Sequence, residues 1–132
     1  MHPRDTVLKF IEQISAQKVD GLCDLMSENH QFIDALGAKV QGREQMRRAW
    51  TGYFQLVPDY HISCEEIFVR GNVVAAFGTA GGTYCPNGEL LKENEWQVPA
   101  AWRAEVTDHL ISEWRVYTDN EPIRRLMAKA NQ

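Results

Sequence analysis

The amino-acid sequence predicts an α+β fold, with three helices in its first half and a curved antiparallel sheet in its second half. Apolar residues between residues 4 and 54 recur mainly at helical spacing, whereas residues 60–118 form long extended segments joined by short turns. Long strands with short turns favour antiparallel pairing, and helices kept apart from strands are typical of α+β domains. If the sheet wraps around the three N-terminal helices, it forms a cone, and the open end of that cone is an internal pocket.

The first two helices are expected within residues 4–26. Apolar side chains recur at positions i, i+3, i+4 and i+7 over about residues 4–17, which predicts an amphipathic helix. These apolar residues are Val7, Phe10, Ile11 and Ile14. Asp20 is the expected N-cap of a short second helix that runs to Met26, because its side chain can accept a backbone N–H of the first turn.

A short strand and a third helix are expected next. Residues 30–34 predict a strand that places Phe32 and Asp34 on the same face, just before a glycine turn. After Gly42, an apolar stripe predicts the third helix. The stripe consists of Met46, Ala49, Trp50, Tyr53 and Phe54, and the helix is expected to end near its last member.

Four strands and a short last helix are expected beyond Pro58. Pro99 marks either a bulge or an edge, because proline cannot donate to a sheet. Gly81–Gly82 marks either a bend or a place where another group approaches the backbone. Asp119, followed by "NEPIRRLM", predicts the start of the last helix. The strands are expected over residues 60–70, 72–84, 89–106 and 109–118.

The composition is that of one globular domain over residues 1–132, with 44% apolar and 24% charged residues. The formal net charge of −4 disfavours a nucleic-acid partner. No apolar segment approaches the ~20 residues that a membrane helix needs, and the N-terminus lacks the apolar core of a signal peptide, so no membrane partner is expected. The 3 cysteines show no C-x-x-C spacing, which predicts free thiols and a cytoplasmic location.

With these elements in place, the chain resembles the nuclear transport factor 2-like (NTF2-like) superfamily, and within it the SnoaL-like and ketosteroid-isomerase-like branch. The resemblance rests on the order and spacing of "VLKFIEQISAQKVDGLCDLM", "HQFIDALGAKVQGREQM", "PAAWRAEV" and "SEWRVYTDNEPI", and it covers essentially the whole chain. It implies a cone of curved sheet lined by three helices, a deep cavity for a small apolar molecule, and a homodimer. No cofactor is expected, because metal-ligand spacings and phosphate-binding or dinucleotide-binding motifs are missing from the sequence.

The comparison with ketosteroid isomerases gives Asp34 the role of general base. In those enzymes the base is an Asp followed three residues later by Gly, and "DALG" places Asp34 and Gly37 in that relation. The same comparison puts Phe10 and Ala101 where the isomerases hold the enolate oxygen with a tyrosine and a protonated aspartic acid. Because removal of one such donor typically lowers the rate ~10²–10³-fold, steroid isomerisation by that mechanism is not expected.

Epoxide hydrolysis is disfavoured as well. Limonene epoxide hydrolase is similar through a "WRDYFD" motif on its final strand, whose first Asp is catalytic. This chain reads "WRVYTD" from Trp114 to Asp119, so Val116 replaces that Asp. Asp119 matches the second acid of the motif, but its place before a helix favours an N-cap over a catalytic role.

The remaining candidates for the pocket are aromatic residues and one arginine. Trp50 lies where isomerases often place a pocket tyrosine, although packing in the core is the alternative for each aromatic residue. Arg103 faces either the cavity, where it would bind a carboxylate or an enolate, or the solvent, in a surface ion pair. The predicted substrate-binding residues are Phe32, Trp50, Tyr53, Trp96, Ala101, Arg103, Trp114 and Val116, with Trp102 as a further aromatic candidate and no metal ligand.

Two functions are therefore expected from the sequence. The first is a cofactor-free isomerase, cyclase or dehydratase in which Asp34 is the general base on a small apolar carbonyl compound. Arg103, Tyr53 or the Trp50 indole would then bind the oxyanion. The second is a non-catalytic ligand-binding or protein-interaction module, in which Asp34 is a polar anchor or a turn residue.

Overall fold

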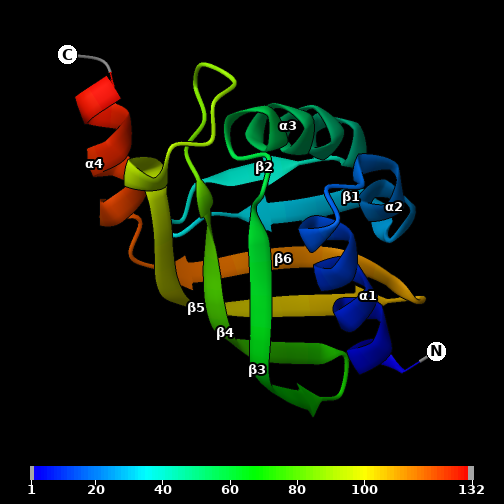
Figure 1. The fold of residues 1–132 in the computed structure, drawn as a ribbon. Coiled ribbons are helices and arrows are strands. Elements are labelled where there is room, and N and C mark those ends of the chain that lie inside the picture. The colour runs from blue at the N-terminus through cyan, green and yellow to red at the C-terminus, as the bar shows by residue number, and fades with distance from the viewer. Residues whose placement is uncertain (1, 131–132) are drawn as a thin grey trace.

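The computed structural model describes residues 2–130, in which helices pack on one face of a six-stranded sheet (Figure 1). The helices are α1 (Pro3–Ser15), α2 (Val19–Asp24), α3 (Arg43–Leu56) and α4 (Glu121–Ala130), with one 3₁₀ turn, η1 (Lys92–Asn94). The strands are β1 (Met26–Ile33), β2 (Lys39–Gln41), β3 (His61–Arg70), β4 (Val73–Thr83), β5 (Glu95–Thr107) and β6 (Leu110–Thr118). The α+β architecture predicted from the sequence is confirmed.

The strands are ordered β2-β1-β6-β5-β4-β3. From β3 to β6 the sheet is an antiparallel meander, and β2 pairs antiparallel with β1. β1 pairs parallel with β6, which the sequence did not indicate. A parallel pair needs a long connection, and here β2 to β5 lie between the two strands in the chain. The sheet is curved but not closed, since β2 and β3 remain as its edges.

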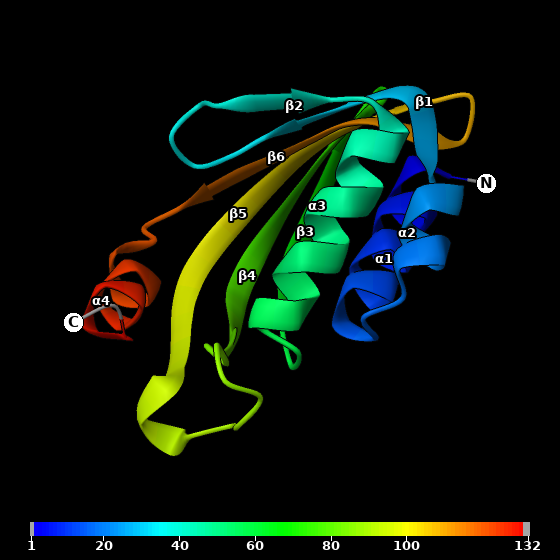
Figure 2. The same cartoon turned by 90° about the horizontal axis from the view of Figure 1, so that it is seen from above.

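The long strands bend around α3, as Figure 2 shows from above. One source of the bend is a register shift in β3 between Cys64 and Glu66, because a bulge increases the local twist of a strand. Gly78 of β4 lies opposite this bulge, and a Cβ there would come within 1.8 Å of the Ser63 carbonyl oxygen. Only glycine fits where these two strands approach so closely.

Two other features of the strands settle alternatives that the sequence left open. A Cβ at Gly82 would lie 2.5 Å from the Val57 side chain and 3.2 Å from the Tyr60 backbone, so the glycine pair marks a close approach. Pro99 carries no bulge, because the pairing of β5 with β4 continues through it. It lies just beyond the end of β6, whose pairing with β5 begins at Ala100.

The bounds of some elements differ from those expected. Asp20 lies in the first turn of α2 rather than at its N-cap, which is Lys18, and its carboxylate pairs with Arg47 of α3. Met26 begins β1 instead of ending α2, so β1 is longer than expected, and β2 was not expected at all. The third expected strand starts later, at Glu95, because η1 precedes it.

The core lies between α1 and the concave face of the sheet. The predicted apolar stripe of α1 is buried, at 7% exposure or less, and fully burying one such side chain contributes about 1.5–3 kcal/mol. α1 packs against β3, β4, β5 and β6, whereas α3 packs mainly against α2, β1 and the edge strand β2. α3 therefore stands away from the central strands, and space remains beneath it.

Candidate functional site

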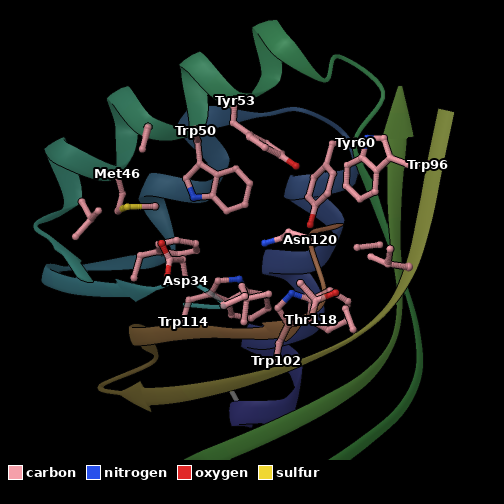
Figure 3. Close-up of a pocket in the computed structure, with 18 residues that line it drawn as sticks. Asp34, Met46, Trp50, Tyr53, Tyr60, Trp96, Trp102, Trp114, Thr118 and Asn120 are labelled. Atoms are coloured by element: carbon pink, nitrogen blue, oxygen red, sulfur yellow. The ribbon is translucent and has the colours of Figure 1, made fainter. Parts of the chain in front are cut away.

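A cavity of about 300 Å³ lies between α3 and the concave face of the sheet (Figure 3). Side chains of β1, β4, β5 and β6 form one side of it, α3 and Tyr60 form the other, and Asn120 lies at the end next to α4. The volume is at the lower end of the range of ~300–1,000 Å³ for small-molecule sites. Most of the lining is apolar or aromatic, and within residues 2–130 Asp34 is the one charged side chain in it.

Most of the residues predicted for the pocket do line it. They come from β1, α3, β5 and β6, which the fold brings around one space. Aromatic residues of this group also pack against one another. They therefore belong both to the hydrophobic core and to the wall of the pocket. The group comprises Phe32, Asp34, Trp50, Tyr53, Trp96, Trp114 and Val116, together with Trp102.

The predicted placement of Ala101 in the pocket is wrong. The residues of β5 that line the cavity are Val98, Ala100 and Trp102, and successive side chains of a strand point to opposite faces. Ala101 therefore faces away from the cavity. Neither Ala100 nor Trp102 is an acid, so β5 supplies no carboxylic acid to this site.

The predicted placement of Arg103 in the pocket is wrong for the same reason. Its guanidinium lies on the outer face of the sheet, where Nη1 is 2.6 Å from Oε2 of Glu113 and 3.0 Å from Oε1 of Glu105. Partial burial alone would lower the pKa of Arg103, but the hydrogen bonds and charges of Glu105 and Glu113 together outweigh it and raise the pKa. The surface ion pair is thus the alternative that holds, and no guanidinium of residues 2–130 lines the cavity.

Asp34 lies at the edge of the cavity and also holds the turn between β1 and β2. Its Oδ1 accepts the backbone N–H groups of Leu36 and Ala38, each at 2.9 Å. The turn is closed further by hydrogen bonds from the Asp34 N–H to the Ala38 carbonyl and from the Gly37 N–H to the Asp34 carbonyl. Gly37 has a φ of 87°, which favours glycine. Oδ2 accepts no hydrogen bond from residues 2–130.

Four aromatic rings above the cavity form one continuous cluster: Trp50, Tyr53, Tyr60 and Trp96. Tyr60 is its centre, with ring centroids 5.0 Å from Tyr53, 6.0 Å from Trp96 and 6.4 Å from Trp50. The Tyr53–Tyr60 pair is edge-to-face, an arrangement that contributes about 0.5–1.5 kcal/mol beyond area burial. The cluster is a rigid wall for a flat or cyclic ligand.

The two tyrosines of this cluster stay protonated. Burial raises the pKa of Tyr60 far above its ordinary value. Burial also raises the pKa of Tyr53, and the neighbouring Tyr60 raises it further. Both phenols are therefore neutral at neutral pH and can act as hydrogen-bond donors.

The polar atoms around the cavity fall into two groups. The indole Nε1 atoms of Trp50, Trp96 and Trp102 are buried and have no hydrogen-bond partner within residues 2–130. The side-chain polar atoms of Tyr53, Tyr60 and Asn120 also make no hydrogen bond within residues 2–130, but they are not buried in this way. A ligand in the cavity can therefore reach the second group without any rearrangement of the first.

Tyr60 and Asn120 were not predicted from the sequence as site residues. Tyr60 was expected to begin a strand, yet it precedes β3 and packs its ring over the cavity. Asn120 stands beside Asp119 between β6 and α4, and its neighbours suggested only a helix start. The signal that was available is that both residues are polar and next to an element boundary, where side chains often reach a pocket.

Asp119 caps the start of α4 with its side chain, but from one residue before the expected N-cap position, which Asn120 occupies. Its Oδ1 accepts the backbone N–H of Glu121, the first residue of α4, at 2.9 Å. The intervening Asn120 provides the carbonyl that accepts the N–H of Arg124. Asp119 does not line the cavity, so capping of the helix fits it better than a catalytic role.

His30 is fully buried next to the cavity without lining it. Its Nδ1 lies 2.7 Å from the Ile111 carbonyl oxygen, and its ring packs against Phe10 with centroids 6.2 Å apart. Burial lowers the pKa of His30, against a smaller opposite effect of that hydrogen bond. In the described part of the chain no three His, Cys, Asp or Glu side chains are grouped in a way that could hold a metal ion.

Comparison with known proteins gives one family and many structures of the same shape. The family model described as the SnoaL-like domain matches residues 7–114. No functionally curated protein gives a significant sequence match. None of the helices in residues 2–130 is both long and apolar enough to cross a membrane.

The similar solved structures share the fold at low sequence identity. A protein of Shewanella denitrificans OS-217 designated a SnoaL-like polyketide cyclase has a TM-score of 0.82 and 12% identity, over 96% of this chain and 97% of that one. A protein of Jannaschia sp. CCS1 with the same designation has a TM-score of 0.77 and 20% identity, over 97% and 88%. An epoxide hydrolase of Mycobacterium tuberculosis similar to limonene epoxide hydrolase has a TM-score of 0.78 and 15% identity, over 96% and 90%.

Proposed function

Because the chain belongs to the SnoaL-like family, with the NTF2-like fold, we propose that its cavity binds a small apolar carbonyl compound and that the protein transfers a proton on it without a cofactor. The single observation that carries this proposal is the position of Asp34. Its carboxylate lies at the edge of the cavity, and no other charged side chain of residues 2–130 lines that cavity. One oxygen of this carboxylate is not engaged in the turn, and a carboxylate beside an apolar cavity can act as an acid or a base on a bound ligand.

Asp34 would act as the general base through Oδ2. Its other oxygen is held by the N–H groups of Leu36 and Ala38, which fix the carboxylate in one orientation. A base held by its own turn needs no ligand to position it, and a positioned base contributes typically ~10²–10⁴-fold to a rate. Isomerisation, cyclisation or dehydration through an enol would each use this single proton acceptor.

The lining of the cavity supports an uncharged ligand. Without Lys or Arg in the described lining, a carboxylate or phosphate in the ligand would be buried unpaired and next to Asp34. The many aromatic rings favour a flat or cyclic carbon skeleton, which can stack on them or pack against their edges.

A non-catalytic binding module is the second candidate, and one observation favours it. The two hydrogen bonds that Asp34 accepts in the β1–β2 turn explain its presence without any chemistry. In that case the cavity holds a metabolite and Asp34 serves the turn alone.

Deuterium exchange separates the two candidates. A panel of small ketones and enones would be incubated with the protein in deuterated buffer, with 1-indanone as the reference because it carries C–H protons next to its carbonyl. Under the catalytic proposal the wild type accelerates exchange at that carbon and Asp34→Asn returns it to the buffer rate, although the variant still binds. Asp24→Asn is the matched control, since Asp24 is exposed at the end of α2 and outside the cavity. Binding without accelerated exchange in the wild type supports the module instead.

We also propose that the protein is a homodimer that associates through the outer face of its sheet. Phe68, Phe77 and Tyr117 are 59%, 43% and 49% exposed, which is unusual for aromatic residues of a monomer. Phe77 pairs with Ala101 and Ala101 pairs with Tyr117, so these side chains form a row on one face. The cytoplasm remains the expected location, in keeping with the unpaired thiols Cys23, Cys64 and Cys85.

A further inference from the structure

The oxygen of a carbonyl ligand needs a hydrogen-bond donor, and the donors proposed from the sequence do not supply one plainly. Arg103 points away from the cavity into surface ion pairs. The Trp50 Nε1 is buried away from the open space. The third candidate, Tyr53, lines the cavity, but its ring packs edge-to-face on Tyr60 and its hydroxyl end is directed toward Tyr60 in Figure 3. A carbonyl group buried without a donor would lose its hydrogen bonds to water, at a penalty that weakens binding.

We propose that the Tyr60 hydroxyl and the Asn120 side-chain amide together form the recognition site for the carbonyl oxygen of the ligand. Both residues line the cavity, and neither side chain makes a hydrogen bond within the described part of the chain. Figure 3 shows the hydroxyl end of Tyr60 and the side chain of Asn120 reaching into the cavity from the side away from Asp34. This inference rests on the proposed function in taking a carbonyl compound as the ligand.

Tyr60 is fixed at its backbone by contacts with two neighbouring elements. Asp59, the residue before it, accepts the backbone N–H and the hydroxyl of Thr83 in β4, each at 2.7 Å. The Tyr60 carbonyl accepts a hydrogen bond from the side chain of Gln17, just beyond α1. Aromatic rings on three sides then hold its own ring in place. The hydroxyl is thus positioned before any ligand arrives, which is how a fixed donor acts most effectively.

Asn120 is fixed by the start of α4. Its carbonyl accepts the first helical hydrogen bond, from Arg124, at 3.0 Å. Asp119 binds the N–H of Glu121, and the Thr118 hydroxyl donates to the Pro99 carbonyl at 2.8 Å. The backbone on both sides of Asn120 is therefore anchored, while its amide remains free to donate to a ligand.

The arrangement places the oxygen of the ligand away from Asp34 and its acidic C–H toward Asp34. If Asp34 removes a proton from the carbon next to the carbonyl, the C–H electron pair forms a carbon–carbon double bond and the carbonyl oxygen becomes negative. Tyr60 and Asn120 then donate to that oxygen. The proton on the Asp34 carboxyl exchanges with solvent, and in deuterated buffer a deuteron returns from Asp34 to carbon as the carbonyl re-forms. Phenol and amide groups are ordinary donors to such an oxyanion.

The test compares 1-indanone with indane, which has the same skeleton without the oxygen. Dissociation constants would be measured by calorimetry or ligand-observed NMR for the wild type, Tyr60→Phe and Asn120→Asp. Both substitutions nearly conserve shape and remove a donor, and the second also places a carboxylate near the oxygen. Each should reduce the preference for 1-indanone over indane roughly 3- to 10-fold, as for the loss of one hydrogen bond, and leave indane binding unchanged.

Two controls carry the same chemical changes outside the cavity. Tyr117→Phe removes a hydroxyl from the outer face of the sheet, and Asn72→Asp replaces an exposed amide in the β3–β4 turn with a carboxylate. Both should keep the wild-type preference. Three results would overturn the proposal. They are a wild type without preference for the ketone, a preference that persists in both cavity variants, and an equal loss of affinity for both ligands.

Failure of this inference is distinguishable from failure of the proposed function. Asp34→Asn should keep the preference for 1-indanone while it abolishes exchange. If the wild type prefers the ketone but does not accelerate exchange, the recognition site stands and the catalytic proposal fails. If exchange is normal in Tyr60→Phe and Asn120→Asp and the preference persists, the catalytic proposal stands and the recognition site is wrong.

Discussion

The Oδ1 atom of Asp34 lies 2.9 Å from the backbone nitrogen of Ala38, and the same atom accepts the N–H of Leu36. One carboxylate oxygen is thus engaged in the turn, while the other makes no hydrogen bond within residues 2–130 and belongs to a residue that lines the cavity. The structural role of Asp34 and the chemical role that we propose for it therefore belong to different atoms and can be tested by different substitutions.

Asp34→Ala should lower the free energy of unfolding by about 0.5–1.5 kcal/mol, because two exposed backbone N–H groups lose their acceptor and bind water instead. Asp34→Asn keeps an oxygen that can accept both hydrogen bonds, so its free energy of unfolding should lie within about 0.5 kcal/mol of the wild type. Urea denaturation of the two variants measures this difference. If Asp34→Asn is as unstable as Asp34→Ala, the turn requires the charge itself, and loss of exchange in that variant would no longer report on catalysis.

The candidate site was predictable from the sequence where it lies within regular elements. Phe32, Trp50 and Trp114 sit at positions of clear strand or helix periodicity, and the fold then brings these faces together. Asp34 could be placed because "DALG" resembles a known motif, although its double use could not be inferred from the sequence alone.

Arg103 and Ala101 were misplaced because a shift of one residue in a strand moves every side chain to the other face. Trp96, Val98, Ala100 and Trp102 alternate along the sequence, and this alternation already indicated which face of the strand points into the cavity. The comparison with isomerases was given more weight and placed Ala101 there instead. Tyr60 and Asn120 lie outside the regular elements, so their directions depend on tertiary contacts that no local pattern encodes.

Asp119→Ala should lower the free energy of unfolding by about 0.5–2 kcal/mol, the usual loss when a capping side chain is removed. The loss follows from the hydrogen bond that Asp119 accepts from Glu121 at the start of α4. Thermal denaturation measures it, and binding of 1-indanone should be retained at saturating concentration. Loss of exchange in a variant that folds and binds normally would instead assign Asp119 to the chemistry.

The stability of the protein should fall on mild acidification because of His30. Burial holds the pKa of His30 below its ordinary value of 6.5, so the unfolded chain takes up a proton there before the folded protein does. The contribution of neutral His30 is fully present above about pH 6.5 and decreases as the pH falls toward the folded pKa, by at most about 1.4 kcal/mol per pH unit.

His30→Gln should flatten this dependence between pH 7 and pH 5.5, as read from urea midpoints, even if it lowers stability overall. His61→Gln is the matched control, since His61 is exposed and should leave the slope as in the wild type. An unchanged slope in His30→Gln would show that another group takes up the proton.

The homodimer is expected to depend on the outer face of the sheet. Phe77 is 43% exposed, and its ring lies 6.1 Å from that of Phe68, which is 59% exposed. Phe77→Lys places a charge in this aromatic patch, and a buried unpaired charge would oppose association strongly. Sedimentation at micromolar concentration should show a dimer for the wild type and a 15.1 kDa monomer for the variant, with unchanged circular dichroism.

Leu56→Lys tests whether the effect belongs to this face. Leu56 is also partly exposed, at 39%, but it ends α3 on the other side of the sheet. This variant should sediment as the wild type does, because a lysine there remains in solvent. Equal dissociation of both variants would move the interface away from Phe77, and a monomeric wild type would mean that the exposed aromatic row serves some purpose other than self-association.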